Sequence, residues 1–182
     1  MTRQIGLLRG INVGGRNRVP MAQLRELMDA LGYTGVETLL QSGNVAFGSK
    51  EPAAKSELRI AERLHDQTGL DIAVLVRTRA ELAAVVKRNP LREHADNPKH
   101  HHVVFLSARP DPKLVAAVDP ADYEPEMFRL HGRELFMWWP AGVHKARLTH
   151  SFWERKLKVT ATARNWNTVQ RLLELAGSDG PV

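Results

Sequence analysis

The stretch QIGLLRGINVGGRNRVP, residues 4–20, decides how the chain begins to fold. Residues 4–11 are an apolar run typical of a strand, and Pro20 suits the start of a helix. The glycines between them permit tight turns and close backbone approach, and the arginine side chains suit phosphate or carboxylate groups. The stretch therefore predicts a strand-to-helix turn that holds an anion.

The spacing of the glycines separates this turn from the common phosphate-binding loops. A Walker loop requires GxxxxGK[ST] and a dinucleotide-binding turn requires GxGxxG, and residues 9–20 match neither pattern. The sequence thus indicates where a site lies rather than which ligand it takes.

Strand and helix patterns alternate through the rest of the first half. A helical repeat of apolar residues follows Pro20 and ends at Gly32. Short strands at 36–40 and 45–47 flank a turn at 41–44, and a helix at 53–68 and a strand at 71–77 come next. A further helix begins near residue 79, where Thr78 and Glu81 are placed as a capping box. The predicted order is β-α-β-β-α-β.

The second half repeats this plan. Residues 89–100 are polar and contain two Asn-Pro steps, so we expect them to connect a first half, 1–88, to a second, 101–182. The second half shows a strand at 102–106, a short helix from Asp111 to Val118, and paired strands at 127–130 and 134–139. Two terminal helices are predicted near 149–157 and 165–176.

This order predicts an α+β fold of two ferredoxin-like βαββα(β) halves packed together, with mainly antiparallel sheets and helices on one face. In such a half the first two strands run parallel. The loop after the first strand, residues 10–20, and the turn after the second, residues 41–44, then lie at the same end of the sheet. We expect these two motifs to form one site.

Length and composition restrict the class of protein. A chain of 182 residues is long enough for one domain or two packed halves. It has no Cys, no apolar run long enough to cross a membrane and no signal-like N-terminus. We therefore expect a cytoplasmic protein without disulfides or membrane contact, and the oligomeric state stays open.

The positive charge is concentrated at both ends of the chain. The formal net charge is +6, residues 1–19 contain four Arg and no acid, and residues 143–172 contain seven Lys or Arg against Glu154 alone. A field of this kind favours anionic partners such as nucleic acid or phosphorylated metabolites. The alternative is that solvated arginines merely raise the isoelectric point.

Each candidate site residue also has a structural interpretation. Arg9, which the pattern places on a strand face with Ile5 and Leu7, binds an anion or pairs internally with Glu37, Asp71 or turn carbonyls. The side-chain amides of Asn12, Gln41 and Asn44 reach a ligand or bond to their own turns. Ser42 lacks the His and acid that a nucleophile needs. The predicted ligand-binding set is Arg9, Asn12, Gly14, Gly15, Arg16, Gln41, Ser42, Asn44, Arg164, Asn165, Trp166 and Asn167.

The last four of these residues precede the C-terminal helix. Amide hydrogens at a helix N-terminus and Arg164 favour an anion, and Trp166 can stack on a base. The alternative is an ordinary helix cap with a core Trp. Both interpretations remain open from the sequence.

The tract His-His-His at 100–102 suggests a metal site only superficially. Consecutive residues of an extended segment point to alternating faces, and no Cys or acidic ligand sits nearby. We expect no metal and no cofactor. The aromatic run 136–139 is more typical of a packed strand than of an RNA-recognition sheet.

Three separated blocks resemble one protein family. RGINVGGRNRVPM, LLQSGNVAF and ATARNWNTVQRLLEL are similar, in this order, to the DUF1697 family of small bacterial proteins, and the resemblance spans nearly the whole chain. It implies a compact α/β fold of ferredoxin-like character. It implies no catalytic residue, because the function of the family is unknown. The chain departs from the family at Lys158, where Gly is more common, and at Leu91, where an aromatic residue is common.

The sequence leaves three functions open. The first is binding of an anionic, phosphate-bearing ligand, nucleotide or nucleic acid, in a cleft formed by the loop 10–20, the turn 41–44 and the helix start 164–167. The second is an enzyme acting on a phosphorylated or carboxylated small molecule there, although no acid–base pair is evident. The third is a purely structural role for all three motifs.

Overall fold

The computed structural model describes residues 1–94 and 97–177. Within them the chain divides into two compact units. The first comprises Met1–Ala84 with residues 171–177, and the second comprises Val85–Gln170. Two helices, α3 (Arg79–Arg88) and α6 (Trp166–Leu175), run across the limits of these units. The limits 1–88 and 101–182 stay a prediction.

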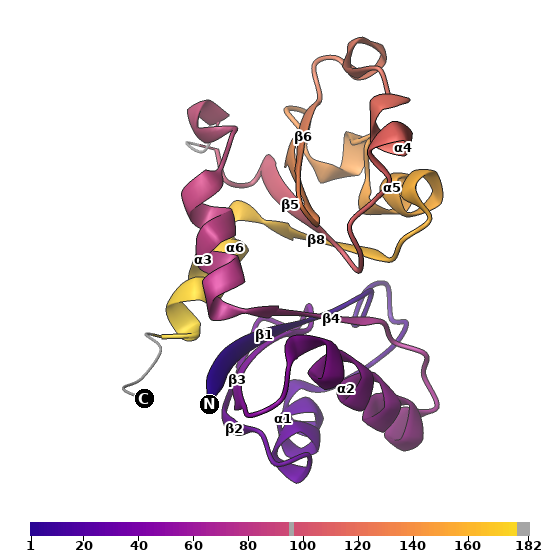
Figure 1. Cartoon of the computed structure of the whole chain (residues 1–182). Helices are drawn as coiled ribbons and strands as arrows, with labels where there is room; N and C mark the ends of the chain where they lie inside the picture. The colour runs from indigo at the N-terminus through magenta and orange to yellow at the C-terminus, as the bar shows by residue number, and fades with distance from the viewer. Residues whose placement is uncertain (95–96, 178–182) are drawn as a thin grey trace. The chain divides into compact units, whose positions relative to one another are not determined.

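The first unit contains a four-stranded sheet with the strand order β2-β3-β1-β4, in which neighbouring strands are antiparallel (Figure 1). Its elements follow the predicted β-α-β-β-α-β order. They are β1 (Thr2–Leu8), α1 (Met21–Ala30), β2 (Thr34–Leu39), β3 (Asn44–Ser49), α2 (Ala53–Thr68) and β4 (Val74–Thr78).

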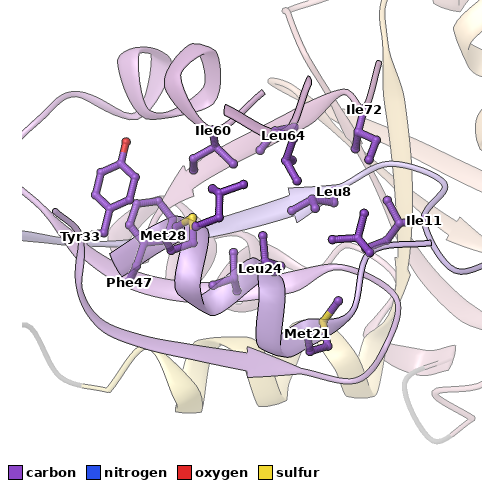
Figure 2. Close-up of a cluster of buried hydrophobic side chains, with 14 of the residues drawn as sticks. Leu8, Ile11, Met21, Leu24, Met28, Tyr33, Phe47, Ile60, Leu64 and Ile72 are labelled. Atoms are coloured by element: carbon purple, nitrogen blue, oxygen red, sulfur yellow. The ribbon is translucent and has the colours of Figure 1, made fainter. Parts of the chain in front are cut away.

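Helices α1 and α2 pack on one face of this sheet and form the core shown in Figure 2. Side chains from the sheet and from both helices are buried there: Leu8 and Phe47 from the sheet, Leu24 and Met28 from α1, and Ile60 and Leu64 from α2. Full burial of one such side chain stabilises the fold by roughly 1.5–3 kcal/mol. The helical spacing of the apolar residues therefore explains why both helices dock.

Strand β1 is buried on both faces. Leu8 faces the helices, and the alternating residues Ile5 and Leu7 are also fully buried. This arrangement accounts for the nearly continuous apolar run in the sequence. The strand ends at Leu8 rather than at the predicted residue 11, because Gly10 has a φ of 65°, outside the extended region. The prediction that Arg9 lies on the strand face is wrong, since Arg9 follows the strand.

The second unit repeats the same topology with the strand order β6-β7-β5-β8, again with antiparallel neighbours. Its elements are β5 (His101–Leu106), α4 (Pro112–Ala116), β6 (Met127–His131), β7 (Glu134–Trp138), α5 (His150–Leu157) and β8 (Ala161–Asn165). Short 3₁₀ turns occur at Arg92–His94, Pro120–Tyr123 and Val143–Lys145. Two four-stranded antiparallel sheets with helices confirm the predicted α+β class.

Strand β8 was not predicted from the sequence. Residues 161–165 are small or polar and look like the approach to a helix, but they pair with β5, with Arg164 opposite Val103. The pairing partner lies about sixty residues earlier in the chain, and local patterns carry no signal for such a contact.

The core of the second unit contains Trp153, which is fully buried and meets Phe128 edge to face at a centroid distance of 4.8 Å. Phe136, Met137 and Trp139 of the aromatic run are buried as well. The run is therefore a packed strand and the residue that follows it. No described helix is long and apolar enough to cross a membrane.

Several predicted helix ends are confirmed by hydrogen bonds. The Glu81 amide donates to Thr78 Oγ1 at 3.1 Å and the Thr78 amide donates to Glu81 Oε2 at 2.8 Å, which is the predicted capping box. Asp111 Oδ1 accepts from the Lys113 amide at 2.9 Å. Helix α5 ends at Leu157, and the next residue, Lys158, has a left-handed φ of 59°. Glycine adopts this conformation more readily, which gives a physical reason for the Gly expected from the resemblance.

Candidate functional site

Residues 10–20, here called the glycine loop, contain a miniature hairpin. Gly14 and Gly15 have φ of 58° and 76°, the two positive values that a tight hairpin turn of type I′ needs. Val13 and Arg16 flank this turn as an antiparallel bridge, with the Arg16 amide donating to the Val13 carbonyl at 3.1 Å. The glycines thus shape a defined turn.

Asn12 holds the base of this hairpin. Its Nδ2 donates to the carbonyls of Val19, at 2.9 Å, and Gln41, at 2.7 Å, and its Oδ1 accepts from the Val19 amide at 2.9 Å. One side chain therefore ties both ends of the glycine loop to the next turn. The prediction that these two motifs lie at the same end of the sheet is met in the structure. These hydrogen bonds satisfy the side-chain amide of Asn12, which therefore needs no ligand as a partner.

The QSGN turn, residues 41–44, packs directly against the end of β1. The Leu8 amide donates to the Gly43 carbonyl at 2.8 Å, and a Cβ added to Gly43 would lie 2.7 Å from Leu8 Cβ. Asn44 is buried and its Nδ2 donates to the Leu39 carbonyl at 2.9 Å and to Ser42 Oγ at 3.0 Å. The side chains of the QSGN turn therefore stabilise its backbone, whereas Gln41 itself is exposed.

The four N-terminal arginines differ in their surroundings. Arg3 donates to the carbonyls of Ala176, at 3.0 Å, and Gly35, at 2.9 Å, so it serves the fold of the first unit. Arg9 is half-buried. Arg16 and Arg18 are exposed, and within residues 1–94 and 97–177 their side chains make no hydrogen bond or ion pair. Arg18, which the predicted set omitted, is thus as available to a ligand as Arg16.

Arg164 is a buried strand residue rather than a helix-terminal one. Its guanidinium donates to Thr162 Oγ1 and to the Ala163 carbonyl, both at 2.8 Å. Burial lowers its pKa to about 10. The side chain therefore remains cationic at neutral pH.

The rest of the 164–167 motif has structural contacts of its own. Asn165 Oδ1 accepts from the Thr168 amide at 2.8 Å and caps α6. Trp166 is buried and stacks on His101 at a centroid distance of 4.6 Å, and Asn167 is exposed. These contacts match the capping alternative. Whether these residues also share a ligand with the glycine loop stays a prediction.

Two adjacent histidines of β5 are buried in the second unit. Both ring nitrogens of His101 and the Nδ1 of His102 have no hydrogen-bond partner among the described residues. Desolvation lowers the pKa of each histidine to about 4. Among the described residues, no group of three His, Cys, Asp or Glu side chains is arranged to hold a metal ion.

We expect acid to destabilise the protein because of these histidines. Their pKa is about 4 in the folded state and near 6.5 when unfolded, so unfolding takes up protons between these values. The contribution of the neutral histidines to the free energy of unfolding is fully present above about pH 7. It decreases as the pH falls, by about 1–2 kcal/mol per histidine at pH 5 after allowance for solvent screening. Urea unfolding at pH 7.5 and pH 5 measures the loss.

The variant His101→Phe, which retains a ring against Trp166, should lose less stability over this interval than the wild type. Replacement of the exposed His144 by Phe is the control, and it should leave the loss of stability between pH 7.5 and pH 5 unchanged. Equal losses in His101→Phe and the wild type would contradict a role for His101.

Two cavities lie outside the predicted residues. One of about 520 Å³ in the first unit is lined by the second half of α2 and by residues 71–73, which precede β4, with His65 Nδ1 and Asp71 Oδ1 2.9 Å apart. The other, of about 290 Å³, lies in the second unit beside Trp139. The sequence held no pattern for either, because both are made by side chains that are brought together only in the folded chain.

Comparison with known proteins confirms the resemblance seen in the sequence. The model of DUF1697, described as a protein of unknown function, matches residues 1–136. The conserved bacterial protein SP0830 from Streptococcus pneumoniae has a similar solved structure, with a TM-score of 0.77 and 22% sequence identity. The alignment covers 96% of this chain and 98% of that one, so the likeness concerns the fold. No curated protein matches.

Proposed function

The chain belongs to the DUF1697 family, whose function is unknown, and we propose that it binds the phosphate backbone of a nucleic acid through Arg16 and Arg18. One observation carries the proposal: the glycine loop has a backbone fixed by Asn12, while both guanidinium groups extend into solvent. Guanidinium groups bind phosphate oxygens through paired hydrogen bonds.

A fixed loop favours binding because little conformational freedom is lost when the ligand arrives. The Asn17 Nδ2 donates to the Gly10 carbonyl at 3.2 Å, and the Asn12 amide donates to the Asn17 carbonyl at 3.1 Å. Arg16 and Arg18 therefore flank a residue that is hydrogen-bonded on both its side chain and its backbone. The backbone at this position is fixed, while the two arginine side chains can still change rotamer to meet a phosphate.

The tip of the hairpin also has room for a sugar-phosphate chain. A Cβ built on Gly14 or Gly15 meets no atom within 4 Å, so open space surrounds the turn. Backbone amides of turns are suitable donors to phosphate when no side chain covers them. This openness supports a polymer lying across the loop.

The exposure of the loop favours a polyanion over a small metabolite. Val13 is 65% exposed, and its neighbours Gly14 to Arg18 are exposed too. Small ligands usually have most of their surface buried in a concave site. A nucleic acid instead gains affinity from several solvent-exposed phosphate contacts and the release of counterions.

Fluorescence anisotropy with labelled single-stranded DNA, duplex DNA and RNA tests the proposal. We expect the logarithm of the association constant to fall linearly with the logarithm of the salt concentration. The double variant Arg16→Ala/Arg18→Ala should bind about tenfold more weakly near 0.1 M salt. Its salt slope on duplex DNA should be smaller by about 1.8, because two phosphate contacts are lost.

The matched control removes two exposed cations elsewhere, Arg109 and Lys113, by the double substitution to Ala. It changes the net charge equally and should retain most of the affinity and the salt slope. Equal weakening in both double variants would show that only net charge matters, and would refute a specific role of the loop. Absence of binding to all three probes in low salt would refute the proposal altogether.

A further inference from the structure

An exposed leucine with a strained backbone lies beside the glycine loop. Leu40, the last residue before the QSGN turn, has a φ of 59° and is 51% exposed. A left-handed backbone disfavours every residue with a Cβ, and bulky residues rarely adopt it. Half of the side chain also remains in water. The fold of the first unit therefore gains little from a leucine at this position.

Hydrogen bonds on both sides of Leu40 fix its backbone. Asn44 Nδ2 donates to the Leu39 carbonyl at 2.9 Å, and Asn12 Nδ2 donates to the Gln41 carbonyl at 2.7 Å. Among the residues that the structure describes, four residues other than glycine have a positive φ, and three of them lie in the glycine loop or directly before the QSGN turn. Strained residues held by their neighbours are typical of ligand sites.

Val13 adds a second exposed apolar side chain at the same end of the sheet. It is 65% exposed and follows Asn12, whose side chain is bonded to Gln41, the neighbour of Leu40. Val13 is also the bridge partner of Arg16. Residues opposite each other in an antiparallel pair extend their side chains to the same face, so an apolar group and a cation point the same way from the hairpin.

Val13 and Leu40, here called the apolar pair, match the chemistry of a nucleotide whose base is accessible. A guanidinium group binds the phosphate, whereas an aliphatic side chain gains free energy only by covering apolar surface, and the faces of the bases are such a surface. In a duplex these faces are stacked, and separating them costs energy. A single strand exposes them. The apolar pair therefore favours a single strand over a duplex.

We propose that the glycine loop and the QSGN turn bind single-stranded nucleic acid, with the apolar pair against unstacked bases. This inference rests on the proposed function, in which Arg16 and Arg18 hold the phosphates. The aliphatic side chains cover a base without reading its hydrogen-bonding edge, so the site accepts any base sequence. A duplex binds more weakly, through its phosphates alone.

Fluorescence anisotropy with three labelled probes of one length tests the base contact: oligo-dT, an abasic strand with the same phosphates, and a duplex. The wild type should bind oligo-dT about tenfold more tightly than the abasic strand. Leu40→Ala should weaken oligo-dT binding about fivefold, the factor expected when contact with the exposed half of the side chain is lost. Its affinity for the other two probes and its salt slope should not change, because an apolar contact releases no counterion.

Two further variants exclude other causes. Leu58→Ala is the matched control, because Leu58 is 65% exposed on α2, and it should bind every probe as the wild type does. Leu40→Gly relieves the left-handed backbone, so it should unfold at a higher urea concentration than the wild type while binding oligo-dT as weakly as Leu40→Ala. Easier unfolding with unchanged affinity would show that Leu40 serves the fold, and would overturn the inference.

Failure of this inference differs from failure of the proposed function. Equal wild-type affinity for oligo-dT and the abasic strand, with the loss in Arg16→Ala/Arg18→Ala retained, would refute the base contact and leave the phosphate contact. Absence of binding to every probe would refute both. Loss of self-association in Leu40→Ala, measured by sedimentation, with unchanged oligo-dT affinity would assign the apolar pair to a second copy of the chain and would also refute the base contact.

Discussion

The substitution Gly43→Ala should lower the free energy of unfolding by about 4 kcal/mol. Gly43 has a φ of 77°, a conformation that costs a residue with a Cβ about 1–2 kcal/mol. The new Cβ would also lie 2.7 Å from Leu8 Cβ and 2.8 Å from Ile11 Cδ1. Both neighbours are buried, so relief of the clash must distort a packed core, at a further cost of about 1–3 kcal/mol.

Gly14→Ala separates the two causes. Gly14 has a similar φ of 58°, but a Cβ there meets no atom within 4 Å. We expect a loss of only about 1–2 kcal/mol in Gly14→Ala, from backbone conformation alone. Urea unfolding of the two variants under one condition gives the comparison. Equal losses would show that the QSGN turn does not pack tightly on β1.

The second large effect is expected for Asn12→Ala, at about 3 kcal/mol. The change removes three hydrogen bonds and leaves the Val19 amide and the carbonyls of Val19 and Gln41 without this partner. It also places a residue that disfavours left-handed backbone at a φ of 55°. Unfolding in urea measures the loss, and anisotropy with the nucleic-acid probes measures binding by the same variant.

Asn12→Asp and Asn12→Gly divide this loss into parts. The aspartate retains an acceptor for the Val19 amide but cannot donate, and the glycine tolerates the backbone angle but has no side chain. The glycine variant should fall between the wild type and Asn12→Ala in stability. The aspartate variant should lose at least as much as Asn12→Ala, because a carboxylate oxygen would face the carbonyls of Val19 and Gln41. If the loop supports binding as proposed, Asn12→Ala should also weaken nucleic acid although both arginines are present. Unchanged affinity in a folded Asn12→Ala protein would contradict preorganisation by Asn12.

The fold was predictable to the extent that its signals are local. Helix α2 has the predicted limits 53–68, and the capping box of Thr78 and Glu81 lies where the spacing placed it. Alternating apolar residues and turn residues revealed the β-α-β-β-α-β order, from which the strand order follows. Strand β8 was missed because it is defined by its pairing with β5, and no short window of sequence contains both strands.

The contact between the glycine loop and the QSGN turn was predictable from the sequence, but the role of each side chain was not. The sequence indicated that the glycine loop and the QSGN turn meet, and the bond from Asn12 to Gln41 joins them. It treated Asn12 and Arg16 alike as ligand candidates. In the folded chain Asn12 is bonded to backbone groups, whereas Arg16 is in solvent.

The sequence by itself determined the class of fold, the place of the glycine loop after β1 and its basic character. These properties depend on periodicity, turn chemistry and charge, which are carried by neighbouring residues. Only the tertiary structure decided which polar groups are satisfied internally and which, such as the side chains of Arg16 and Arg18, are exposed to solvent. The physical reason is that burial and hydrogen-bond partners depend on residues far apart in the chain, as in the cavity beside Trp139.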